Sequence, residues 1–135
     1  MSQQTVFQQI GGFPTFQRLV DEFYNRVEND PELRRIFPPE LEAGKQGQLL
    51  FLVQYFGGPG TYSQERGHPR LRMRHAPFVI GPRERDLWLK YMLEAIEVVG
   101  IAEPARTEMR DYFKRSATFM INKPDASHPS LKVID

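Results

Sequence analysis

The sequence contains no cysteine and no long run of apolar residues. Without cysteine the chain has no disulfide bonds, thiolate metal ligands or cysteine nucleophiles. No stretch approaches the roughly 18 consecutive apolar residues of a membrane-spanning helix, so we expect no membrane span. The first residues show no basic stretch followed by an apolar one, and we therefore expect no secretory signal and a cytoplasmic location.

The chain also lacks an excess of charge of either sign. Its 18 lysines and arginines nearly balance its 17 aspartates and glutamates, for a net charge of +1. No global field therefore favours nucleic acid or an anionic membrane. The basic run Arg70-Leu71-Arg72-Met73-Arg74 has no aromatic residue interleaved for base stacking. We interpret this run as a solvated face and expect no nucleic-acid partner.

Several kinds of catalytic site lack their usual residue patterns. Carboxylates are numerous, but none is paired in an apolar setting as acid–base catalysis prefers. The serines have no nucleophile-elbow context, and the glycine-rich stretch after Phe56 has no phosphate-binding lysine. With only three histidines in the chain, we expect no metal site made of side chains alone.

Apolar residues recur at helical spacing along most of the 135-residue chain. Phe16, Leu19, Val20, Phe23 and Val27 fall at i, i+3, i+4, i+7 and i+11, on one face of a helix. No segment shows the alternation of a strand, so the sequence predicts an all-α fold. The predicted helices cover residues 16–28, 31–37, 41–56, 82–99 and 104–121, with a short helical turn at 71–75.

One domain is expected, because single cores of about 100–200 residues are usual. We place it at residues 1–124 and interpret residues 125–135 as a polar C-terminal tail. The segment from Gly57 to Pro69 is rich in helix breakers and shows no strand pattern, so we expect a long loop there.

His75 is the histidine whose surroundings suggest chemistry. It lies in the segment Met73-Arg74-His75-Ala76-Pro77-Phe78, between arginines and apolar residues. A haem ligand needs this combination, because a neutral imidazole binds iron, apolar neighbours face the porphyrin and cations meet its carboxylates. From the residues alone, a capping or core histidine is the alternative. We interpret His68 and His128 as loop and tail residues.

Tyr24, Gln48 and Trp88 each place a hydrogen-bond donor on or beside an apolar helix face. They could line a pocket, or they could be core polar groups with partners of their own. Gly44 and Gly47 lie inside a predicted helix, where each costs about 1 kcal/mol relative to alanine. Either that helix starts late, or the glycines form a pocket wall that approaches a flat ligand or leaves a passage open.

Three glycine-containing motifs give the sequence a family resemblance. Ile10-Gly11-Gly12-Phe13 precedes the first long helix, Phe56-Gly57-Gly58-Pro59 follows the third helix, and residues 57–78 read GGPGTYSQERGHPRLRMRHAPF. From residue 7 to about residue 124 the chain resembles the group II truncated haemoglobins. The resemblance implies a truncated globin fold, a two-on-two helical sandwich around haem b and its iron.

The resemblance also assigns residues to the site. It implies His75 as the iron ligand, and Tyr24, Gln48 and Trp88 as donors that stabilise a ligand on the opposite side. Tyr62 and Arg74 would contact the haem propionates. The residues expected around the cofactor and its ligand are Tyr24, Phe37, Gly44, Gly47, Gln48, Tyr62, Arg74, His75, Phe78 and Trp88.

Two positions depart from the family pattern. Globins often have histidine or another blocking side chain where this chain has Gly44, so we expect an open short route to the iron. Some relatives have a lysine where this chain has Gly47, and we expect one propionate contact to be missing here.

Three donors around O2 would slow its release, since each contributes about 1 kcal/mol or more in a dry pocket. Slow release favours redox or detoxification chemistry with peroxide or nitric oxide over bulk oxygen transport. That chemistry would need an electron-donating reductase, and the protein would act as a monomer or a weak homodimer. Whether it is an enzyme stays open. The alternatives are a non-catalytic sensor of O2 or nitric oxide, an oxygen carrier, or a helical interaction module without a cofactor.

Overall fold

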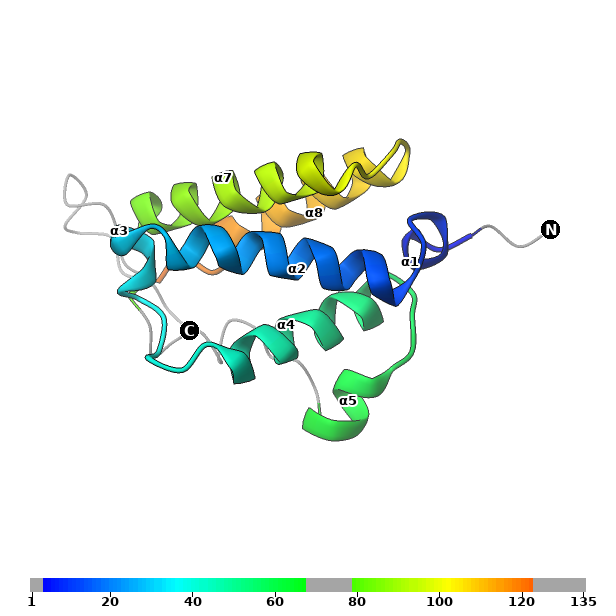
Figure 1. Ribbon diagram of the computed structural model, residues 1–135, viewed down its shortest axis with the longest axis horizontal. Helices are drawn as coiled ribbons and strands as arrows, with labels where there is room; N and C mark the ends of the chain where they lie inside the picture. Colours follow the sequence, from blue (N-terminus) through cyan, green and yellow to red (C-terminus); the bar gives the residue numbers. More distant parts are fainter. Residues whose placement is uncertain (1–3, 68–78, 123–135) are drawn as a thin grey trace.

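The computed structural model describes residues 4–67 and 79–122, which form helices and no strand. This confirms the predicted all-α class for that part of the chain (Figure 1). None of its helices is long and apolar enough to cross a bilayer. The helices are α1 (Val6–Gln9), α2 (Phe13–Glu28), α3 (Pro31–Arg34), α4 (Glu42–Tyr55), α5 (Thr61–Arg66), α7 (Pro82–Val99) and α8 (Ala105–Phe119).

The helix boundaries follow the local sequence. α2 and α7 each have a proline in their first turn, where its missing N–H costs nothing. α7 ends at Gly100, whose φ of 81° and ψ of 38° form a left-handed cap. α3 is a single turn, shorter than the predicted helix over 31–37. After Arg34 the chain tightens into turns, in which the Ile36 N–H donates to the Leu33 carbonyl and the Phe37 N–H to the Arg34 carbonyl.

The structure corrects one expectation about the middle of the chain and decides against one alternative. α5 lies inside the segment 57–69, for which the sequence predicted a loop. The prediction was wrong because the breakers flank a six-residue stretch without glycine or proline, and Gly67 ends it at a φ of 78°. The idea that the third helix starts late is also wrong, because α4 includes both Gly44 and Gly47. The predicted turn at 71–75 and the tail at 125–135 lie outside the described residues.

α2 is the central helix of the molecule. It lies between α4 on one side and α7 on the other, and α8 packs against α7 (Figure 1). The helices thus form two layers, one with α2 and α4 and one with α7 and α8. The largest fully buried side chains come from α2, α3, α7 and α8, and they are Phe16, Phe23, Phe113, Leu19, Leu33, Met92, Ile96, Met109, Val20 and Val27.

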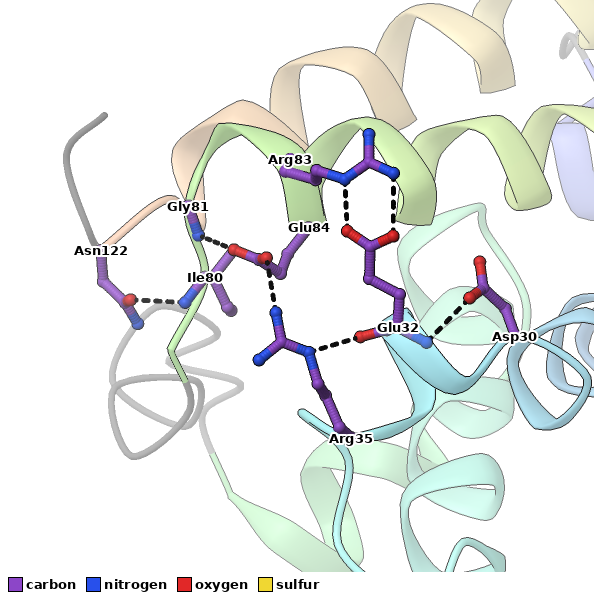
Figure 2. A network of polar contacts seen from close by, with 8 residues as sticks. All are labelled: Asp30, Glu32, Arg35, Ile80, Gly81, Arg83, Glu84 and Asn122. Carbon is purple, nitrogen blue, oxygen red and sulfur yellow. Dashed lines mark hydrogen bonds and ion pairs between the residues drawn. The ribbon is translucent and has the colours of Figure 1, made fainter. Parts of the chain in front are cut away.

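Ion pairs hold α3 against the start of α7 (Figure 2). The Arg83 guanidinium pairs with the Glu32 carboxylate, with Nη2 at 2.8 Å from Oε1. Arg35 bridges the two helices, since its Nε donates to the Glu32 carbonyl at 3.0 Å and its Nη2 lies 3.6 Å from the Glu84 carboxylate. Each exposed pair contributes little alone. As a connected group they fix the turn after α3, which includes Phe37.

A second contact joins the chain before α7 to the chain after α8 (Figure 2). The Ile80 N–H donates to Oδ1 of Asn122 at 2.9 Å, and the Asn122 N–H donates to the Ile80 carbonyl at 2.8 Å. Ile80 is buried, so this pair satisfies backbone groups that would be costly to leave unpaired.

Candidate functional site

A cavity of about 290 Å³ opens between the two layers. Seven of the residues predicted from the sequence line it, and they come from α2, α4, α5, α7 and the turn after α3. These seven are Tyr24, Phe37, Gly44, Gly47, Gln48, Tyr62 and Trp88. The other three predicted residues, Arg74, His75 and Phe78, lie outside the described residues.

Most of the remaining wall of the cavity is apolar. Its apolar members are Ile36, Pro38, Phe51, Leu52, Ile80, Phe113, Ala117 and Met120. Sequence reasoning assigned none of them to the site, because periodicity does not distinguish a pocket wall from a filled core. Arg66, Glu84, Arg85, Tyr112 and Ser116 complete the lining, and the sequence analysis did not single them out either.

Tyr24 brings a phenol from α2 into this apolar wall. Its side chain is 5% exposed, and its ring packs edge-on against Phe23 and Phe37, with centroids 5.4 Å and 6.0 Å away. Burial raises the pKa of Tyr24 to about 12, because a phenolate would lose its hydration. At neutral pH the group is therefore a protonated hydroxyl that can donate a hydrogen bond.

Gln48 lines the same cavity and has a polar atom without a hydrogen-bond partner. Its side-chain Oε1 is buried and has no hydrogen-bond partner among the described residues. A buried polar atom without a partner costs about 1–3 kcal/mol, and such atoms usually mark a site for a ligand or a water. Gln48 is therefore suited to contact a polar ligand inside the pocket.

Trp88 is the third donor-bearing residue, and it comes from the opposite layer. Its ring lies 5.1 Å from Phe23 and 5.9 Å from Phe113, between centroids. The side chain is only partly buried by protein, because one side of it borders the cavity. Donor-bearing side chains from α2, α4 and α7 thus border a single apolar space.

The two glycines of α4 keep side-chain volume away from the cavity. Gly44 is exposed and also lines the cavity, and a Cβ built there would lie 3.4 Å from Oη of Tyr24. A Cβ at Gly47 would lie only 2.7 Å from Nη1 of Arg66. The structure thus favours the interpretation of these glycines as a pocket wall.

These features fit a flat, largely apolar cofactor with charged edges, such as the haem predicted from the sequence. The apolar lining would face the ring system, and the glycines of α4 give it close access. Tyr62, 3% exposed, and Arg66 bring polar groups to the side formed by α5.

Comparison with known proteins also points to a haem protein, because the matches are to globins. The family model described as bacterial-like globin matches residues 5–122. Group 2 truncated hemoglobin YjbI of Bacillus subtilis is 40% identical over 119 residues, which cover 88% of this chain and 90% of that protein.

Solved structures match along most of the chain as well. The hemoglobin of the thermophilic phototrophic bacterium Chloroflexus aurantiacus is 61% identical, with a TM-score of 0.88, over 90% of this chain and 100% of that chain. The group II truncated hemoglobin of Bacillus anthracis is 37% identical, with a TM-score of 0.90, over 96% of this chain and 99% of that chain.

The raised pKa of Tyr24 makes stability sensitive to alkaline pH. The folded-state value of about 12 lies above the ordinary value of 10, so stability is retained below pH 10 and lost as the pH rises from 10 through 12. Between pH 10 and 12, we expect Tyr24→Phe to reduce the slope of the unfolding free energy against pH by about 1 kcal/mol per pH unit. Urea unfolding followed by circular dichroism at several alkaline pH values measures it, and parallel curves for the two proteins would contradict the burial of this phenol.

Proposed function

This chain belongs to the bacterial-like globin family, as a group II truncated haemoglobin that binds haem and O2, and we propose that it serves redox chemistry. The two-on-two sandwich expected from the resemblance is confirmed by the match to solved truncated haemoglobins. One observation carries the proposal. Tyr24, Gln48 and Trp88, from three different helices, line the same apolar cavity.

The iron of the cofactor would supply the chemistry, because a haem iron with one protein ligand keeps a coordination position for a diatomic molecule. We propose His75 as that protein ligand. The support is its sequence context and a family match that spans it. Arg74 and Phe78, beside it in the sequence, are proposed to contact the propionates and the porphyrin.

The three donors would stabilise a bound diatomic ligand by donating hydrogen bonds to its partial negative charge. The Tyr24 hydroxyl is protonated at neutral pH, with its pKa raised further by burial to about 12, and the Gln48 amide and the Trp88 indole N–H offer two more donors. In an apolar cavity such hydrogen bonds are stronger than in water. The pocket would therefore release O2 slowly, which suits peroxide or nitric oxide chemistry better than bulk oxygen transport. An electron-donating reductase is the partner that this role requires.

Gly44 would give small molecules a short route into the pocket. It lines the cavity and is itself exposed, and its lack of a side chain leaves no group there to block entry. An open route suits a reaction in which a second small reactant must reach the same site.

The proposed iron ligand can be tested by removing its imidazole. We expect His75→Gly to lose the ferrous spectrum of a histidine-ligated haem and to recover it when free imidazole is added, because the small ligand can replace the side chain. Visible absorption spectra measure both, with His68→Ala as the matched control. An unchanged spectrum and equally tight cofactor in His75→Gly would show that another residue holds the iron.

The donors can be tested through the rate of O2 release. Each hydrogen bond is worth about 1 kcal/mol, so Tyr24→Phe and Trp88→Phe should each speed dissociation roughly fivefold. The double variant should be faster than either single variant. Stopped-flow displacement of O2 measures the rates. Fast release from the wild type, unaltered in the double variant, would refute the donor proposal.

Catalytic turnover would distinguish redox chemistry from ligand sensing or oxygen transport. With a reductant present, we expect catalytic consumption of peroxide or nitric oxide, and a slower bimolecular step in Gly44→Leu because the added side chain narrows the route. Stopped-flow and steady-state assays measure these steps. Tight O2 binding without turnover of either reactant would instead support a sensor or carrier.

A further inference from the structure

Two tyrosine rings in contact connect the cavity with the surface of the molecule. Tyr112 of α8 lines the cavity and is 8% exposed, whereas Tyr55, at the end of α4, is 50% exposed. Their ring centroids lie 4.2 Å apart, and the ring planes are inclined by 34°. One phenol thus borders the pocket, the other borders the solvent, and no third group separates them.

The packing around the pair holds both rings in this arrangement. The Phe56 ring contacts both of them, with centroids 5.0 Å from Tyr55 and 5.4 Å from Tyr112. Phe113 lies 5.3 Å from Tyr112 on the other side. Phenylalanine at both positions could make these ring contacts equally well. The packing therefore explains the rings but not the hydroxyl of Tyr55.

A phenol differs from a phenyl ring in that it can be oxidised by one electron. Tyrosine gives up an electron together with its hydroxyl proton and becomes a neutral radical, which phenylalanine does not do under the same conditions. Only a strong oxidant draws an electron from tyrosine. Peroxide activated at a haem is such an oxidant, so the pair bears on the peroxide branch of the proposed function.

The two tyrosines differ in how easily they can release the proton. Burial raises the pKa of Tyr112, and a hydrogen bond with Ser116 acts in the opposite direction. Its proton can stay in that hydrogen bond while an electron passes through the ring. Tyr55 is exposed and can release its proton to water. The exposed ring is therefore the place where an oxidation that starts in the pocket would end.

The cavity itself leaves little room for an aromatic reductant. Its volume is about 290 Å³, and a bound porphyrin would fill most of it. A larger electron donor then needs a site outside the pocket. The described residues include all five tyrosines of the chain, and of these only Tyr55 is exposed. Its ring offers a face on which another aromatic ring can stack.

We propose that Tyr55 is a surface site at which electron-rich phenols are oxidised, connected to the pocket through Tyr112. This inference rests on the proposed function, and specifically on its peroxide chemistry. In each cycle the O–O bond of one hydrogen peroxide breaks, and two electrons and two protons convert it into two waters. Each electron leaves Tyr55 through the Tyr112 ring, while the Tyr55 proton passes to water. A phenol then returns a hydrogen atom to Tyr55 and leaves as a phenoxyl radical, so two phenols are oxidised per peroxide.

Tyramine coupled to dextran tests the site, because this phenol is too large to enter the pocket. With peroxide and the haem-loaded protein, we expect the phenols to couple, and the fluorescence of the dityrosine product measures this. Tyr55→Phe and Tyr112→Phe should each lose most of the coupling. Tyr55→Trp should restore it, because an exposed indole can also be oxidised. Tyr91→Phe is the matched control, since Tyr91 is a partly exposed tyrosine whose hydroxyl donates to Asp30.

A second measurement locates the radical without any added phenol. After peroxide treatment with a nitroso spin trap, mass spectrometry of the peptides should find the label on Tyr55 in the wild type and in Tyr91→Phe. The label on Tyr55 should fall in Tyr112→Phe, which a purely structural role of Tyr112 would not explain.

The proposal is overturned if Tyr55→Phe couples the dextran conjugate as fast as the wild type, or if the wild type carries no label on Tyr55. Visible spectra of the haem-loaded protein report its reaction with peroxide separately. A wild type that does not react with peroxide would overturn the proposed peroxide chemistry as well, so the two failures are distinct.

Discussion

Phe23 makes the contact on which the site depends. It is fully buried on α2, and its ring meets both Tyr24 and Trp88, at centroid distances of 5.4 Å and 5.1 Å. One apolar side chain thus joins the two layers and sets the spacing between two hydrogen-bond donors. Because aromatic rings in a close-packed core have few alternative positions, the donors are held in place before any ligand arrives.

The pocket is then the part of the core that the side chains do not fill. Glycine at residues 44 and 47 removes volume from α4, and the buried Gln48 oxygen is left without a partner there. Folding alone gains nothing from an unpaired acceptor, whereas a ligand or a water that donates a hydrogen bond to it would offset its cost. Sites of function are where such local costs are expected in a protein.

Most of the fold could be predicted from the sequence, since α2, α4, α7 and α8 carry long apolar stripes at helical spacing. α5 could not, because six residues are too short for a periodic pattern and the glycines around them suggested a loop. Seven pocket residues could be named, but largely through resemblance to a family; from the residues alone, Tyr24 and Trp88 had an equally ordinary core interpretation. The contact between Gly47 and Arg66 was missed for a different reason. It joins residues on two helices, and no local pattern reports what fills the space beside a glycine.

The reciprocal hydrogen bonds between Ile80 and Asn122 have a consequence for the mechanics of the molecule. They connect residues 42 positions apart, at the open end of the hairpin formed by α7 and α8. The turn after Gly100 joins the two helices at one end, and these bonds join them at the other. A helical hairpin joined at both ends resists splaying, so we expect α7 and α8 to move little relative to each other. We then expect any adjustment that admits or releases a ligand to occur in the opposite wall, where α4 carries its two glycines.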